Sequence, residues 1–336
     1  MGKNLEVIPS QMCEGINTAE DMKKLCQNLQ DQIVNQIKAK YKEEILKGKS
    51  VSDNPTIYII GGQNASGKSR LITELGKINN NTVSIIIDDM KEHHPFRNYI
   101  DKNFPEESEE LLHLSCFEVF DTLLDELLQE GYDIVIERTL GSKEKAEKYI
   151  VPPANQGYNI DINVTGTHGI NSILSALERF VVECQLKDEY LRTNSNLKID
   201  PRPISPKHHD DTYNNIISVL EYAESGKFKD NKGNPIFPKI SVWDRTPGKP
   251  TKIYKSDDMR YHNSREAMEA ARQRDLNRCK SATEYGVVQR ISNIKLDLEN
   301  AKPGDTLDEY RDFCMMFLQL IEERAAEYMC EKVPIA

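Results

Sequence analysis

A glycine-rich run limits what this chain can fold into more than any other feature. Residues Gly62–Ser69 match the phosphate-binding pattern G-x-x-x-x-G-K-S, and the β-branched run Thr56–Ile60 before them is typical of a strand buried on both faces. The glycines let backbone N–H groups turn toward phosphate oxygens, Lys68 reaches the β- and γ-phosphates, and the Ser69 hydroxyl ligates Mg²⁺. The sequence therefore predicts a loop that binds ATP and Mg²⁺, formed by Gly62, Gln63, Asn64, Ala65, Ser66, Gly67, Lys68, Ser69 and Arg70.

Strand and helix patterns alternate after this loop. The strand-like runs are Thr82–Ile87, Ile134–Ile136, Ile160–Val164 and Ile240–Trp243, and the helical stretches between them include Ser108–Gln129, Ile170–Leu191 and Thr212–Ala223. Such alternation indicates βαβ units. We expect an α/β fold of the P-loop kinase kind, with about five mostly parallel strands and helices on both faces of the sheet.

Helical patterns also flank this region. Thr18 to about Lys47 is predicted to be a helix that Thr18 caps, and Gly48 with the following residues forms a linker. Beyond about Asp258, three more helices are predicted over Ser264–Glu284, Val287–Asn300 and Thr306–Met329. We divide the chain into a helical N-terminal segment (1–50), a P-loop kinase domain (51–250) and a helical C-terminal extension (251–336). In the extension, one apolar stripe is more typical of a core than of a partner groove: Leu307, Phe313, Met316, Phe317, Leu320 and Ile321.

Composition excludes several classes of partner. A formal net charge of −10 argues against non-specific nucleic-acid binding, which rewards clustered Lys and Arg. The apolar runs are too short to span a bilayer and the N-terminus lacks a signal-peptide core, so we expect a cytoplasmic protein with no membrane partner. Delivery into another cell is left open. The seven cysteines include no C-x-x-C pair, which favours neither disulfides nor a zinc site.

The remaining motifs favour a small-molecule kinase among P-loop proteins. No D-x-x-G follows a strand-like run, and no N-K-x-D or L-S-G-G-Q-like motif is present, which argues against a GTPase switch and an ABC-type ATPase. A kinase needs a base for the acceptor hydroxyl, and strand ends face the ligand crevice of a parallel sheet. Asp88 is the preferred base at the end of the second strand; Asp89 is second, and one of the two could cap the next helix instead. Glu137, at the end of the third strand, would orient a Mg²⁺-bound water or the substrate, or form a strand-end ion pair.

The order of motifs resembles the zeta-toxin family of P-loop kinases. The motifs are Gly61–Ser69, Ile87–Pro95, Glu130–Thr139, Glu178–Phe180 and Arg202–Asp210, with Val242–Arg245 similar to the family's closing strand. Many members phosphorylate UDP-N-acetylglucosamine. The resemblance implies ATP- and Mg²⁺-dependent phosphorylation of a small-molecule hydroxyl, most readily on that sugar-nucleotide, and an antitoxin is a conceivable protein partner.

The resemblance also assigns roles to individual residues. Asp88 would activate the acceptor, Lys68 would hold the phosphates, and Arg179 and Arg202 would stabilise the phosphoryl charge. Glu137 and Thr139 would lie beside the sugar-nucleotide. The family's acidic substrate residue falls on Asp121, although Glu118 lies one turn earlier.

Several departures from the family pattern affect the acceptor side. Met90 replaces an aromatic residue, Arg138 replaces a glycine, and about ten extra residues separate Arg179 from Arg202. The acceptor could therefore be another nucleotide sugar, a dinucleotide, an antibiotic or another metabolite. A nucleotide-binding regulatory module without phosphoryl transfer is the alternative from a different class.

Three further alternatives concern single elements. Arg179 could be a surface charge paired with Glu183. His208 and His209 are expected to be structural caps before the helix that begins at Thr212. The N-terminal helix is expected to pack on the core, and the sharper hypothesis is that it occludes the nucleotide pocket.

Overall fold

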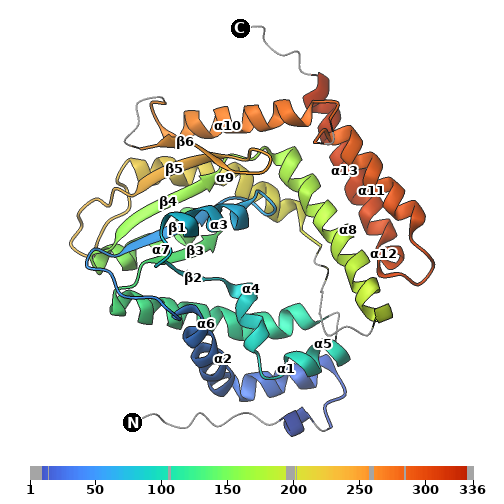
Figure 1. The fold of residues 1–336 in the computed structure, drawn as a ribbon, viewed down its shortest axis with the longest axis horizontal. Helices are drawn as coiled ribbons and strands as arrows, with labels where there is room; N and C mark the ends of the chain where they lie inside the picture. Colours follow the sequence, from blue (N-terminus) through green and yellow to red (C-terminus); the bar gives the residue numbers. More distant parts are fainter. Residues whose placement is uncertain are drawn as a thin grey trace. The chain divides into compact units, whose positions relative to one another are not determined.

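The computed structural model describes residues 10–13, 15–104, 107–193, 201, 203–256, 261–283 and 285–330 (Figure 1). None of the helices in these residues is both long and apolar enough to cross a membrane. The predicted arginine Arg202 lies outside the described residues.

Six strands form one mostly parallel sheet in the order β2-β3-β1-β4-β5-β6. The strands are β1 (Thr56–Gly61), β2 (Val83–Ile85), β3 (Ile134–Arg138), β4 (Asn159–Thr165), β5 (Lys239–Asp244) and β6 (Thr251–Lys255). The pairs β2/β3 and β4/β5 are parallel, whereas β6 runs antiparallel to β5. Flanking helices complete the predicted α/β fold, which is confirmed. The strand β6 was not predicted, because its lysines interrupt the apolar run, as is usual in edge strands.

The helices differ from the expected ones mainly at their ends. They are α1 (Ala19–Asn28), α2 (Gln30–Ile45), α3 (Lys68–Ile78), α4 (Ile87–Met90), α5 (Arg97–Asn103), α6 (Ser108–Glu130), α7 (Lys143–Asn155), α8 (Gly169–Thr193), α9 (Pro206–Glu224), α10 (Ser264–Cys279), α11 (Val287–Asn300), α12 (Thr306–Glu309) and α13 (Arg311–Cys330). The N-terminal helix breaks at Leu29, and Thr18 caps α1 as predicted. Helix α9 begins six residues early, because Ser205 caps it and Pro206 suits the first turn. The prediction that His208 and His209 cap this helix is therefore wrong, since both lie inside it.

The chain divides into two compact units. The first consists of Met1–Ile57, Asn79–Ile136 and Gln156–Tyr158, and the second of Tyr58–Ile78, Glu137–Asn155 and Asn159–Ala336.

In the first unit, helices α1 and α2 pack against α6. Lys38 and Lys42 of α2 reach Glu126 of α6 at 2.6 and 3.1 Å, and buried Ile33 and Ile37 lie on the same helix. The N-terminal helices therefore pack within this unit, as expected. Whether they also regulate nucleotide binding stays a prediction.

In the second unit, the C-terminal helices pack on α8. Figure 1 shows α11, α12 and α13 beside α8, and buried Phe180 of α8 belongs to the same apolar cluster as Leu307, Phe317 and Ile321. The expected stripe is thus mainly core. Met316 is the exception, because 64% of it is exposed.

His94, in the first unit, and His168, in the second, are two of the three buried histidines among the described residues. Each Nδ1 accepts a backbone N–H at 3.2 Å, from Phe96 and from Ile170 respectively. Burial lowers the pKa of His94 to about 4, and the charge of Arg97 adds to the effect. Burial also lowers the pKa of His168 to about 4. Both rings are therefore neutral in the folded protein near pH 7.

We expect the free energy of unfolding to fall as the pH drops from about 6.5 toward 4. The folded pKa values lie below those of unfolded histidines, so the unfolded chain binds more protons in this window and acid favours it. Each histidine contributes at most about 1.4 kcal/mol per pH unit. Urea unfolding at pH 7 and pH 5 measures the effect. The variants His94→Asn and His168→Asn should flatten the pH dependence, and exposed His208→Asn should not. Equal stability of the wild type at both pH values would contradict the prediction.

Candidate functional site

The predicted phosphate loop connects β1 to α3 in the second unit. Its backbone takes positive φ at Gly62 (152°), Ala65 (56°) and Gly67 (98°). Helix α3 begins at Lys68, and the first N–H groups of a helix have no acceptor within it. The loop and the helix therefore present the donors and the positive dipole end that a phosphate group requires.

The ammonium group of Lys68 is buried inside this loop. Only 7% of the residue is exposed, and its Nζ donates to the carbonyl oxygen of Gln63 at 3.0 Å. A carboxylate oxygen of Glu137, on β3, lies 3.5 Å from the same Nζ. Burial lowers the pKa of Lys68, the charge of Glu137 opposes this, and the charge of Arg179 adds to the lowering. Lys68, Glu137 and Arg179 therefore share one electrostatic environment.

Hydroxyl groups from β4 and the following turn hold the loop in place. Thr165 donates to the Ser66 hydroxyl at 2.7 Å, and Thr167 donates to the Ser66 carbonyl oxygen at 2.7 Å. The buried amide of Gln63 donates to the Thr167 carbonyl oxygen at 2.8 Å and to the Ser172 hydroxyl at 3.0 Å. These buried hydrogen bonds therefore hold the backbone of the loop in position.

A chain of polar contacts continues from Ser172 to the C-terminal helix. The Ser172 hydroxyl lies 2.8 Å from Nε2 of His209, and Nδ1 of His209 lies 3.1 Å from Asp210. Arg324 of α13 donates to both oxygens of Asp210 at 2.9 and 2.7 Å. Burial lowers the pKa of His209, which keeps the ring neutral, so Nδ1 donates to Asp210 and Nε2 accepts from Ser172. Ser172 and His209 are at most 1% exposed, so these two residues support the loop and meet no substrate.

We expect Gly62→Ala to destabilise the protein by about 1–3 kcal/mol. A Cβ atom at this position would fall 2.5 Å from the Thr165 hydroxyl and closer still to the Ser66 hydroxyl, at a φ that side chains avoid. Gly76→Ala is the matched control: nothing lies within 4 Å of its Cβ position in α3, and alanine favours helices by about 0.5–1 kcal/mol. Thermal unfolding measures both variants. An unchanged midpoint for Gly62→Ala would contradict the crowding argument.

The remaining predicted residues of the second unit surround the loop. Ser69 is exposed in the first turn of α3, and Thr139 directly follows β3. Arg179, on α8, is about half exposed and lies 3.5 Å from Glu183, the contact we named as its alternative role. Among protein groups, the Ser69 hydroxyl and the Glu137 carboxylate are oxygen ligands of the type that Mg²⁺ takes beside substrate phosphates. These residues fit a Mg²⁺–nucleotide complex.

Asp88 and Asp89 lie in the first unit, on helix α4 rather than at a strand end. Strand β2 stops at Ile85, and the helix begins two residues later, so the expected strand Thr82–Ile87 is too long. Lys91, only 2% exposed, donates to Asp88 at 2.8 Å and to both oxygens of Glu109 at 2.8 Å. Burial raises the pKa of Asp89, and the charge of Asp88 raises it further. The two neighbouring aspartates therefore differ: Asp88 contacts a buried cation, and the pKa of Asp89 is raised.

The acidic candidates of α6 also belong to the first unit. Asp121 is partly buried, and Glu118 accepts a hydrogen bond from Gln30 at 2.8 Å. The contact with Gln30 gives Glu118 a role in packing α2 against α6. Asp121 therefore stays the proposed acidic residue for the substrate.

Arg245 is a loop contact that the sequence interpretation did not include among the site residues. It directly follows β5, and its Nη1 donates to the Ala65 carbonyl oxygen at 3.1 Å while Nη2 donates to Ser175 at 3.1 Å. Burial lowers the pKa of Arg245 from its usual value. The Asp244-Arg245 pair at the closing strand was the signal that could have identified it.

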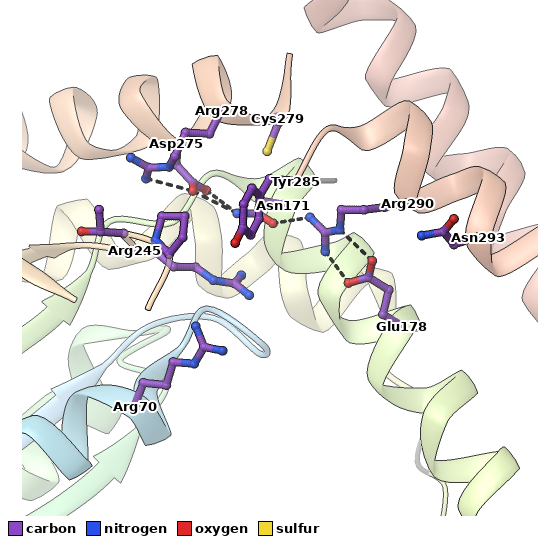
Figure 2. Close-up of a pocket in the computed structure, with 12 residues that line it drawn as sticks. Arg70, Asn171, Glu178, Arg245, Asp275, Arg278, Cys279, Tyr285, Arg290 and Asn293 are labelled. Atoms are coloured by element: carbon purple, nitrogen blue, oxygen red, sulfur yellow. Dashed lines mark hydrogen bonds and ion pairs between the residues drawn. The ribbon is translucent and has the colours of Figure 1, made fainter. Parts of the chain in front are cut away.

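A cavity of about 270 Å³ adjoins Arg245 and the start of α3 (Figure 2). Its walls come from α8, from α10 and α11, and from the segment after β5. Four arginines line it: Arg70, Arg245, Arg278 and Arg290. Within the described residues, no cluster of three or more His, Cys, Asp or Glu side chains could hold a metal ion.

Comparisons with known proteins agree with these motifs. The sequence model of the zeta toxin family matches residues 42–255. Toxin zeta of Streptococcus pyogenes is 26% identical over 192 residues, which cover 56% of this chain and 63% of the relative. Toxin PezT of Streptococcus pneumoniae serotype 4 is 23% identical over 202 residues, covering 60% and 73%. The chain thus spans less than two thirds of the length of Toxin zeta.

A solved structure supports the same fold. A chain from the PezAT chromosomal toxin–antitoxin system of Streptococcus pneumoniae superposes with a TM-score of 0.56 at 17% identity, covering 90% of this chain and 97% of that one. The family match covers more than half of the present sequence and includes the loop, Asp88 and Glu137. The chain therefore belongs to the zeta toxin family.

Proposed function

We propose that this protein is an ATP- and Mg²⁺-dependent phosphotransferase that phosphorylates a hydroxyl group of a small molecule. The observation that carries the proposal is the complete phosphate loop, with Lys68 buried in it and Glu137 at 3.5 Å. A buried ammonium whose one carboxylate neighbour is partly exposed is well suited to a polyanion. Membership in the zeta toxin family supports the reaction class.

Residues of the second unit bind the nucleotide and stabilise the charge on its phosphates. When bound, ATP supplies the phosphoryl group and Mg²⁺ offsets the charge on its β- and γ-oxygens. Loop N–H groups and Lys68 would hold the phosphates, and Ser69 and Glu137 would hold the metal directly or through water. Arg179 and Arg202 stabilise charge on the transferring group. The family resemblance assigns Thr139 and Asp121 to the acceptor.

Asp88 is the proposed general base of the reaction. It accepts the proton of the acceptor hydroxyl as the acceptor oxygen bonds to the γ-phosphorus and the bond from that phosphorus to ADP, the leaving group, breaks. The contact with buried Lys91 positions this carboxylate, and Glu109 accepts the other hydrogen bonds of the same ammonium group. Among the described residues no ammonium or guanidinium group donates to Asp89, and burial raises its pKa, which favours Asp88 for the role.

We propose UDP-N-acetylglucosamine as the acceptor and a cytoplasmic antitoxin as the inhibitory partner. The relatives are named as toxins, and PezAT is a toxin–antitoxin system. Met90 and Arg138 depart from the family pattern on the acceptor side, so a dinucleotide, an antibiotic or another metabolite is the second candidate class.

The acceptor is tested by incubating the protein with ATP, Mg²⁺ and UDP-N-acetylglucosamine. Mass spectrometry should detect the sugar-nucleotide with one added phosphate, and omission of Mg²⁺ should abolish it. Transfer to a different compound of a metabolite extract would overturn the choice of acceptor but retain the kinase. Binding of ATP without transfer to any compound would overturn the phosphotransferase proposal.

A further inference from the structure

The C-terminal extension supplies six of the twelve residues that line the cavity beside the phosphate loop. Helix α10 supplies Arg278 and Cys279, helix α11 supplies Arg290, and Tyr285 comes from the segment between the two helices. All of these residues follow residue 255, where the family match ends. A volume of about 270 Å³ is close to the lower limit of small-molecule pockets, roughly 300–1,000 Å³.

Two of the four arginines in the cavity are neutralised by carboxylates. Arg290 binds Glu178 through Nε and Nη2, and Arg278 binds Asp244 and Asp275. Arg278 thereby joins α10 to β5, and Arg290 joins α11 to α8. These pairs fix the walls of the cavity and place three carboxylates beside these two arginines.

The other two arginines are not neutralised in this way. Arg245 donates to a carbonyl and a hydroxyl oxygen, and Arg70 makes no hydrogen bond or ion pair with another described residue. The two guanidinium groups point into the same space in Figure 2. Burial lowers the pKa of Arg245, the charges of Arg290 and Arg70 add to this, and the charges of Asp275 and Glu178 oppose it. Two cations that repel each other in a partly buried cavity indicate that an anion belongs between them.

The strand order indicates which part of a nucleotide would occupy the cavity. Glu137 lies on β3 and Arg245 follows β5, and these strands are on opposite sides of β1, from which the loop emerges. A nucleotide whose γ-phosphate reaches Lys68, beside Glu137, has its nucleoside end toward the other side. That side holds Arg70, Arg245 and the cavity.

We propose that the C-terminal extension completes the nucleoside subsite of this protein. The base and ribose of a purine nucleotide occupy the cavity, the Tyr285 ring forms an aromatic wall for the base, and the α-phosphate lies against Arg70 and Arg245. The inference rests on the proposed function, because it assumes a nucleoside triphosphate on the loop. It gives the extension, whose role the sequence leaves open, a part in choosing the donor nucleotide.

The test compares the affinity for Mg²⁺–ATP with that for Mg²⁺–tripolyphosphate, which has the three phosphates but no nucleoside. Isothermal titration calorimetry on the full chain measures both. Because stacking of a base on an aromatic ring is lost, Tyr285→Ala should weaken ATP binding about 10-fold and leave tripolyphosphate unchanged. Arg70→Ala should weaken ATP binding by a similar factor. Val288→Ala, an exposed residue of α11 outside the cavity wall, is the matched control and should change neither.

The outcomes separate this inference from the proposed function. Equal affinities of the wild type and Tyr285→Ala for ATP would overturn the nucleoside subsite while leaving the phosphate loop in place. An equal loss for both ligands in Tyr285→Ala would also overturn it, because it would indicate general damage. If the wild type bound neither ligand, the proposed function itself would fail.

Discussion

Replacing Asp88 by asparagine is expected to lower the rate of phosphoryl transfer by about 10²–10⁴-fold with little change in ATP affinity. The amide has nearly the shape of the carboxylate but cannot accept the proton of the acceptor hydroxyl. The reaction would then have to deprotonate its nucleophile without a positioned base. A coupled assay of ADP release under saturating acceptor measures kcat, and calorimetry measures ATP binding.

The contacts of Asp88 predict that this variant folds. Lys91 keeps both oxygens of Glu109 as partners at 2.8 Å, so the buried ammonium is not left without a carboxylate. Asp89→Asn, one residue along the same helix, is the matched control and should retain activity within a few-fold. If Asp89→Asn loses as much activity as Asp88→Asn, or if Asp88→Asn is fully active, the assignment of the base is contradicted.

Replacing Lys68 by methionine is expected to weaken ATP binding and to lower transfer by about 10³-fold. Lys68 is the buried cation of the loop, and a neutral side chain cannot offset the charge that develops on the γ-phosphate. The fold should survive, because methionine fills a similar volume and Glu137, whose side chain is 31% exposed, can be hydrated when its partner is lost.

Lys77→Met provides the control for this change. Lys77 lies on the same helix α3, is 64% exposed and pairs with Glu74, so removing it should affect neither ATP binding nor transfer. The comparison also tests whether removing any positive charge near the loop lowers ATP binding and transfer. Loss of activity in both variants, or in neither, would contradict a specific role for Lys68.

Local sequence patterns were sufficient to predict the phosphate loop and most of the sheet. A buried β-branched run followed by G-x-x-x-x-G-K-S defines both β1 and the start of α3 within two residues. The same patterns misplaced Asp88 at a strand end. Ile86 has an extended backbone but precedes helix α4, and its apolar side chain gave no sign that the strand had already ended.

The contacts that complete the site join residues far apart in the sequence. Arg245 binds Ala65, Arg290 binds Glu178, and Arg324 binds Asp210 across more than 100 residues in each case. Helical and strand periodicity reports only which face of an element is buried. It does not report which surface arginine meets which carboxylate, so the sequence could predict helices in the extension but not their contribution to the cavity.

Transfer of the γ-phosphate to a small molecule tests the central proposal most directly. Protein, Mg²⁺ and ATP labelled with ³²P at the γ-position would be incubated with a small-molecule metabolite extract, and the products separated by chromatography. The proposal predicts a new labelled compound other than inorganic phosphate, formed by the wild type and absent with Asp88→Asn and Lys68→Met. Label found only in ATP and inorganic phosphate, with the wild type still binding ATP, would contradict it and favour a nucleotide-binding module without phosphoryl transfer.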